Sequence, residues 1–112
     1  MYYRNIQFSD TAKNELGTIT KKVDSFTNGV YNMYNTDAEC RDLDKLIELL
    51  KEEDTIVQLR KTYKKNHLKR VDNELYTVPI RLVFIELLNT LEKIADNTYT
   101  IAKSMVYNNN LI

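Results

Sequence analysis

The stretch IRLVFIELLNTLEKIADNTYTIAKSM, residues 80–105, has the most regular apolar spacing in the chain. Its apolar positions recur at alternating intervals of four and three residues, which places them on one side of an α-helix. The members of this stripe are Ile80, Phe84, Leu87, Leu91, Ile94, Thr98, Ile101 and Met105. The pattern predicts a long amphipathic helix over residues 78–107 that buries this stripe against other helices.

A second stripe with the same spacing lies near the N-terminus. Its members are Ala12, Leu16, Ile19, Val23, Phe26, Val30 and Met33. The stripe predicts a helix over residues 9–34, with Ser9 or Asp10 as its N-cap. Gly17 and Gly29 lie beside the stripe, and each destabilises the helix by about 1 kcal/mol relative to alanine. We therefore expect both glycines to let a neighbouring helix come close.

The middle of the chain, residues 37–70, predicts the remaining helix. Thr36 followed by Glu39 has the form of a capping box, which predicts that the helix begins directly afterwards. The apolar stripe of its first half is Leu43, Leu46, Ile47, Leu50 and Val57. Beyond that point two continuations are open. One uses Lys61, Lys64 and Leu68, and the other uses Ile56, Leu59, Tyr63 and His67.

The composition of the chain is typical of a fold made of a few long helices. The 112 residues suffice for one domain with a single modest core, and two glycines and one proline are too few for a turn-rich β fold. Because the connections between the three predicted helices are short, neighbours should run antiparallel. We predict a single all-α domain over residues 1–112, an up-down-up three-helix bundle.

Charge and cysteine content exclude several classes of protein. Sixteen basic and sixteen acidic residues give a net charge of zero, so composition does not favour a nucleic-acid partner. The basic run at residues 60–70 fits the C-terminal half of a helix, although contacts with nucleic acid or phosphate are an alternative. The single cysteine, Cys40, favours a reducing compartment. No stretch has the roughly 18–20 apolar residues of a membrane span, and no secretory signal is visible, so we expect a cytoplasmic protein.

The sequence carries no pattern that is typical of an enzyme. It lacks a glycine-rich phosphate loop, and His67 is its only histidine, which excludes a multi-histidine zinc site. Lys64 occupies the position, three before His67, that di-iron bundles fill with glutamate. We therefore expect no catalytic residues, and we expect His67 to be partly exposed near the end of its helix.

Two carboxylates, Glu92 and Asp96, lie four residues apart and therefore on one face of the third helix. They could belong to an ordinary solvated surface, or they could bind a hard cation that prefers oxygen ligands. Two carboxylates are too few for such a site, so the second helix must contribute from Glu52, Glu53 or Asp54. Asp54 falls on the apolar face of that helix if its first pattern continues. The candidate metal ligands are accordingly Glu92, Asp96 and Asp54.

The segment IELLNTLEKIADNTYTIAKSMVY, residues 85–107, resembles the signature helix of the PhoU family. That helix typically reads Leu-Glu-Arg-Ile-Gly/Ala-Asp, followed by Ile-Ala/Cys. Residues 91–96 match it with Lys93 in place of arginine, and residues 101–102 match its tail. Upstream, YKKNHLKRV at residues 63–71 is similar to the exit of the second helix in the PhoU-like domain of bacterial sodium/phosphate cotransporters. The resemblance covers nearly the whole chain as one three-helix repeat.

This resemblance implies a non-catalytic, cytosolic regulatory domain of phosphate transport. The chain would be the soluble domain of a sodium/phosphate cotransporter, or a separate protein that forms a homodimer. Its partner would be a membrane transporter domain, at the inner face of the membrane, or a phosphate-signalling protein. The alternatives are a helical protein-interaction module without a phosphate role and, less favoured, a carboxylate-metal enzyme.

The resemblance also implies metal binding through paired acids on the second and third helices. Glu92 and Asp96 match the pair on the third helix. Asp54 matches one acid of the second helix, but Leu50 occupies the position of the other. The candidate cofactors are iron, manganese, zinc or magnesium, or none.

Overall fold

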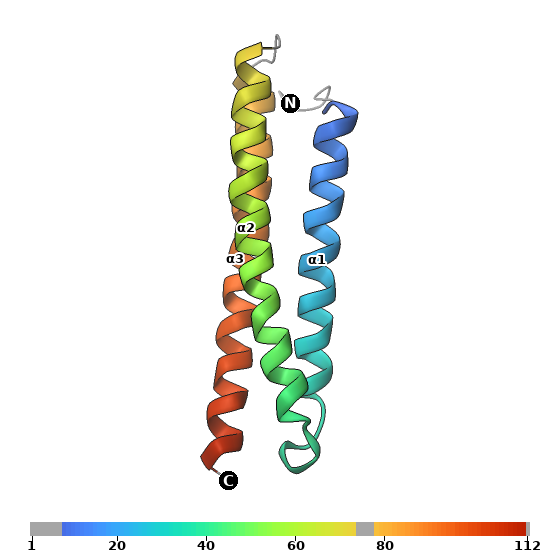
Figure 1. The fold of residues 1–112 in the computed structure, drawn as a ribbon, viewed down its shortest axis with the longest axis vertical. Coiled ribbons are helices and arrows are strands. Elements are labelled where there is room, and N and C mark those ends of the chain that lie inside the picture. The colour runs from blue at the N-terminus through green and yellow to red at the C-terminus, as the bar shows by residue number, and fades with distance from the viewer. Residues whose placement is uncertain (1–7, 74–77, 112) are drawn as a thin grey trace.

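The structure is a computed structural model that describes residues 8–73 and 78–111. It contains α1 (Asp10–Tyr34), a short 3-10 turn η1 (Ala38–Cys40), α2 (Leu43–Asn73) and α3 (Val78–Leu111). The three helices run alternately in opposite directions, and each contacts the other two (Figure 1). This confirms the predicted all-α, up-down-up three-helix bundle. In the part of the chain that is described, no helix is long and apolar enough to cross a membrane.

The first helix forms as the sequence predicts. The Ser9 side chain is its N-cap and accepts a hydrogen bond from the backbone N–H of Ala12 at 3.2 Å. Every member of the predicted stripe contributes to the core. Five are buried, Ala12, Ile19, Val23, Phe26 and Val30, and two are partly buried against them, Leu16 and Met33.

The start of α2 was predicted wrongly. The Thr36 hydroxyl donates to the carbonyl of Asn32 at 2.9 Å and so closes α1 rather than opening α2. The chain then forms η1, and Arg41 Nε donates to the carbonyl oxygens of Met33 at 2.9 Å and Thr36 at 3.1 Å. These hydrogen bonds stabilise a longer connection, so α2 begins at Leu43 and not near residue 37.

The second half of α2 follows one of the two continuations that the sequence left open. Ile56 and His67 are fully buried, and Leu59 and Tyr63 pack against the core, whereas Lys61 is exposed. In the first half, Leu46 is buried as predicted, but Ile47 is 40% exposed. The helix continues to Asn73, somewhat beyond the predicted end at residue 70.

The buried face of α3 matches the predicted one only in part, since Phe84, Thr98 and Met105 are buried as predicted and Leu91 is partly buried. Its buried residues are Phe84, Leu88, Ala95, Thr98, Ala102 and Met105. Three members of the predicted stripe are instead exposed, Leu87 by 41%, Ile94 by 42% and Ile101 by 49%. The four-three spacing was right, but the helix is rotated about its axis so that Ala95 and Ala102 face the core. Small side chains at these positions let three long helices approach one another. The sequence also offers Thr77 as the N-cap of this helix, but Thr77 lies outside the described residues. At its other end, α3 continues past the predicted end at 107 to Leu111.

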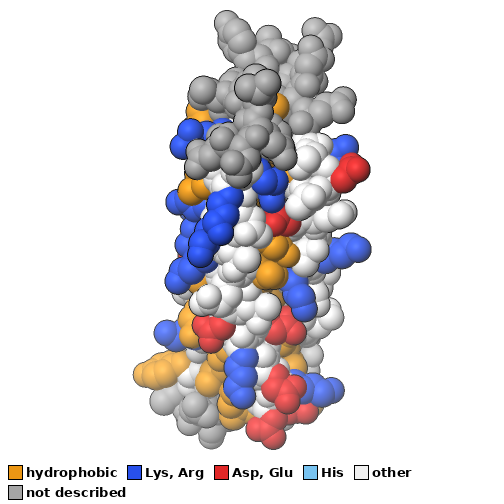
Figure 2. Space-filling view, turned by 45° about the horizontal axis from the view of Figure 1, so that its top comes forward, with side chains coloured by type: hydrophobic (Ala, Val, Ile, Leu, Met, Phe, Trp, Pro, Cys, Tyr) orange, Lys and Arg blue, Asp and Glu red, His pale blue; other side chains and the backbone are white. Residues whose placement is uncertain are grey.

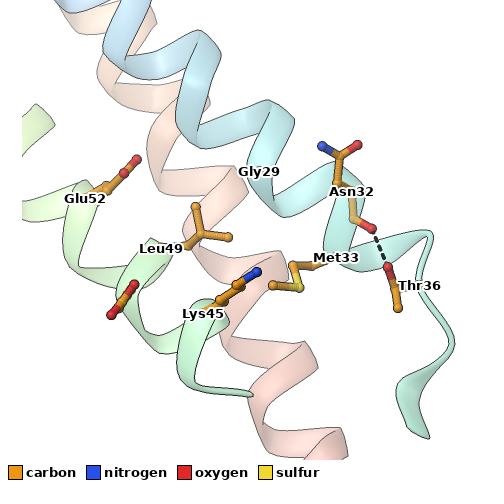
Figure 3. A pocket seen from close by; sticks show the side chains of 8 residues that line it. Gly29, Asn32, Met33, Thr36, Lys45, Leu49 and Glu52 are labelled. Atoms are coloured by element: carbon orange, nitrogen blue, oxygen red, sulfur yellow. Dashed lines mark hydrogen bonds between the residues drawn. The ribbon is translucent and has the colours of Figure 1, made fainter. Parts of the chain in front are cut away.

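The two glycines of α1 have different surroundings. A Cβ atom added to Gly29 would lie 2.6 Å from Cδ2 of Leu49, and Figure 3 shows Leu49 pointing from α2 toward this part of α1. No atom lies within 4 Å of a Cβ added to Gly17. The expectation of close helix approach is therefore confirmed at Gly29 and wrong at Gly17.

These surroundings predict opposite outcomes for the same substitution. Gly17→Ala should raise the free energy of unfolding by about 1 kcal/mol, because alanine is the better helix former and the site has room. Gly29→Ala should give no gain or a loss, because the Leu49 side chain must move to admit the new methyl group. Urea denaturation followed by circular dichroism measures both changes. Equal stabilisation by the two variants would contradict the close packing at Gly29.

Candidate functional site

The predicted carboxylates of α3 face α2 and interact with two of its residues. Oε2 of Glu92 lies 2.5 Å from Nε of Arg60, and both side chains are largely buried, 22% and 18% exposed. Asp96 shares a hydrogen bond with the side chain of Glu53. Asp54, the third candidate ligand, is exposed on the surface of α2. The structure therefore brings Glu92 and Asp96 against α2, but the acid that bonds to Asp96 is Glu53.

The sequence contained a signal for this arrangement. The buried face of α2 passes through Leu49, Ile56, Tyr63 and His67. Glu53 and Arg60 fall on the same face, since they continue its four-three spacing. Following the apolar residues alone placed Asp54 on the inner side and overlooked Arg60.

The surroundings of Glu53 change the pKa of its carboxyl group strongly. Its pKa is raised from 4.5 to about 7 by burial, by the hydrogen bond to Asp96, and by the negative charges of Asp96, Asp54 and Glu92. Two adjacent carboxylates in a partly desolvated site cannot both ionise without repulsion. Protonated Glu53 can donate this hydrogen bond to Asp96, which joins α2 to α3.

The metal-site hypothesis can be compared with this geometry. Glu92 is neutralised by Arg60, whose positive charge opposes a second cation at the same carboxylate. Asp96 is hydrogen-bonded to Glu53, whose raised pKa of about 7 opposes its use as an ionised ligand. Across the described ranges, no three histidine, cysteine or acidic side chains are grouped so that they could hold a metal ion. The side chains as placed do not fit a divalent cation, and the metal site of Glu92, Asp96 and Asp54 stays a prediction.

The raised pKa of Glu53 makes stability depend on pH. In the folded state Glu53 binds its proton more tightly than in the unfolded state, so its ionisation destabilises the fold as pH rises from about 4.5 to about 7. Glu53→Gln keeps a donor toward Asp96 and removes the charge. We expect this variant to exceed the wild type in unfolding free energy by about 1 kcal/mol at pH 8, and by nothing at pH 4.5.

Chemical denaturation of both proteins between pH 4.5 and 8 measures this difference. Comparing the two proteins at each pH removes the effect of every group that they share, His67 included. A difference between them that does not change with pH would contradict the raised pKa of Glu53.

A second polar cluster lies where the later turns of α2 meet the first turns of α1. The carboxylate of Glu15, on α1, is 9% exposed and accepts hydrogen bonds from Asn66 Nδ2 at 3.0 Å and Arg70 at 2.7 Å. The Arg70 guanidinium also lies 5.6 Å from the centre of the Phe84 ring on α3. This cluster joins all three helices. The apolar spacing did not predict this cluster, although Glu15 falls within the buried stripe of α1 between Ala12 and Ile19.

His67 belongs to the same region, and its predicted partial exposure is wrong. Its ring is fully buried and stacks on Phe84, with ring centres 4.1 Å apart and planes 14° from parallel. Burial lowers the pKa of His67 below 6.5, and the positive charge of Arg70 adds to this, while a hydrogen bond to the backbone of Arg81 opposes it. His67 is therefore neutral at pH 7 and acts as a packing group between α2 and α3.

The basic run of α2 divides between the inside and the outside of the bundle. Arg60 and Arg70 turn inward to Glu92 and Glu15, whereas Lys61, Lys65 and Lys69 are exposed. Figure 2 shows basic side chains along one edge of the upper half of the molecule and acidic ones gathered toward the lower end. The two arginines of the run thus have structural ion-pair partners.

One surface of α3 is apolar but faces outward. Leu87, Ile94 and Ile101 recur every seven residues along it and are each about half exposed. Beside Ile101, the α1 residues Tyr31 and Tyr34 are 56% and 63% exposed. A shallow groove between the two helices is lined by Thr27, Val30, Tyr31, Tyr34, Thr98 and Ile101. This surface offers a partner a large apolar contact.

Comparison with known proteins gives no match: no family model, no curated protein and no solved structure is significantly similar to this chain. Its function must therefore be inferred from its own residues.

Proposed function

We propose that this chain is a non-catalytic, helical regulatory domain that acts by docking to another protein. The observation that carries the proposal is that α3 has two adjacent apolar stripes, while α1 and α2 cover only one of them. Covering a half-exposed leucine or isoleucine stabilises a complex by on the order of 1 kcal/mol. Contiguous apolar patches on a folded protein commonly mark interaction sites.

The resemblance to the PhoU family supports a more specific form of this proposal. Residues 91–96 lie on the last helix of a three-helix bundle, which is the context in which the family motif is expected. The specific proposal is a domain that regulates phosphate transport by docking to a membrane transporter domain, at the inner face of the membrane, or to a phosphate-signalling protein. The binding of a partner would bias how the bundle packs against the transporter.

The alternative is a helical interaction module without a phosphate role. The ion pair between Glu92 and Arg60 favours this alternative, because it gives Glu92 of the family motif a role in joining α2 to α3. That role requires neither a metal nor phosphate.

Phosphate uptake by cells from which the chain has been deleted tests the proposed function. Deletion should change the uptake rate of radiolabelled phosphate at least about twofold, and the wild-type chain should restore it. Ile94→Glu should fail to restore it, because a charge enters the apolar surface, whereas Leu82→Glu serves as the matched control. Leu82 is 52% exposed on another side of the same helix. Unchanged uptake after deletion would refute the phosphate role and favour the generic module.

Metal content tests the remaining part of the resemblance. Under the metal hypothesis, the purified, untagged protein carries iron, manganese, zinc or magnesium in near-stoichiometric amount, and Glu92→Gln/Asp96→Asn loses it. Elemental mass spectrometry of the two proteins measures the difference. Equal metal content in both would refute the site and leave Glu92 as the ion-pair partner of Arg60.

A further inference from the structure

We propose that the outward apolar surface of α3 is the interface of an antiparallel homodimer, with a two-fold axis near Thr90. This inference rests on the proposed docking function and names the occupant of the docking surface as a second copy of this chain. It is carried by the pattern of uncharged residues along α3 and by the two charges at its edge.

The uncharged pattern is a second stripe beside the buried one. Its members are Val83, Leu87, Thr90, Ile94, Asn97, Ile101 and Ser104, which we call the outer stripe. They follow the same four-three spacing as a coiled-coil seam, and all of them except Val83 are exposed. Large aliphatic residues alternate with small or polar ones, and Asn97 resembles the single polar residue that fixes register in such seams. No member carries a charge that dimerisation would have to desolvate.

The edge of the outer stripe carries two opposite charges, Glu86 and Lys93, seven residues apart. Each directly precedes an aliphatic member, and each is exposed. When two copies of α3 run antiparallel about an axis near Thr90, Glu86 of each copy faces Lys93 of the other. The same axis places Leu87 of one copy between Thr90 and Ile94 of the other. Each contact forms twice, as a two-fold interface requires.

A parallel pairing lacks this complementarity. In a parallel seam, Glu86 of one copy would lie opposite Leu91 of the second copy. Leu91 is uncharged and packs against the core of its own bundle. Glu86 and Lys93 would then have no charged partner across the interface. The charges therefore favour the antiparallel arrangement.

The size of the surface suits a dimer of moderate affinity. From Val83 to Ser104 the outer stripe is ~32 Å long and about one helix wide, and Tyr31 and Tyr34 of α1 widen it beside Ile101, to roughly 400 Å² per copy. This is about half of the roughly 800 Å² per partner of a standard interface, as expected of a reversible dimer. Ile101 and Tyr31 would reach Ile80 and Val83 of the second copy. A net charge of zero adds no long-range repulsion between copies.

Sedimentation equilibrium of the full chain tests the proposal. We expect the wild type to reach twice its monomer mass of 13.2 kDa, with a dissociation constant below about 100 µM. Ile94→Glu should weaken association at least about tenfold, and Leu82→Glu should leave it unchanged. Both side chains are already half exposed, so both variants should keep the wild-type helix content by circular dichroism.

Charge reversal tests the antiparallel orientation. Glu86→Lys and Lys93→Glu should each weaken the dimer, because each sets like charges against one another twice. The double variant Glu86→Lys/Lys93→Glu should restore wild-type association. A dimer that Ile94→Glu weakens but that the double variant fails to restore would overturn the proposed orientation and register.

Two outcomes would overturn the dimer itself. One is a wild-type monomer up to about 500 µM, and the other is a dimer that Ile94→Glu does not weaken.

Other outcomes would assign the surface to a different partner. A monomer that floats with phosphatidylcholine vesicles, with Ile94→Glu losing this property, would assign the surface to a lipid bilayer. If the protein is monomeric but Ile94→Glu still abolishes the rescue of phosphate uptake, the docking function stands with a different partner. A dimer with no effect on uptake would refute the phosphate role alone.

Discussion

The arrangement of the three helices depends on the charged and polar side chains that α2 turns inward. Arg60 pairs with Glu92 on α3, and Arg70 pairs with Glu15 on α1. Removing one partner of a largely buried ion pair leaves the other charge desolvated, which costs about 3–5 kcal/mol when burial is complete. Purely apolar stripes can slide or rotate against one another at low cost. These two pairs favour one register and one rotation of α2 against α1 and α3.

The rotation of α3 follows from this constraint. Arg60 pairs with Glu92, and Glu53 is hydrogen-bonded to Asp96. Both contacts turn the acidic edge of α3 toward α2, so the neighbouring face, which ends at Thr98, points into the bundle. Ala95 and Ala102 then lie at the centre of the bundle, and Ile94 and Ile101 are left at its outer edge. The surface to which we assign docking is thus a consequence of the polar contacts on the other side of the same helix.

The same contacts bear on the function of the acidic motif. In the PhoU family the paired acids can bind metal clusters, yet here each of them has a partner on α2. The Glu53 side chain, whose pKa is raised to about 7, is hydrogen-bonded to Asp96, and His67 packs at the junction of α2 and α3. The motif therefore fixes the position of α3, whatever it binds in addition.

The sequence by itself determined the helical fold, the number of helices and the inner face of α1, because spacing of four and three residues specifies a packed helix. It also determined that Glu92 and Asp96 share one face. It could not determine which of two adjacent stripes α3 buries. The exposed residues Leu87, Ile94 and Ile101 are at least as apolar as the buried residues Leu88, Ala95 and Ala102. It misplaced the start of α2, because the hydrogen bonds of Arg41 to the end of α1 join groups that a local capping pattern does not include. Only the tertiary structure decided these points, and it also decided the partners of Arg60, Glu53 and His67. The physical reason is that ion pairs and ring stacking between helices depend on the rotation of each helix, which local spacing leaves free.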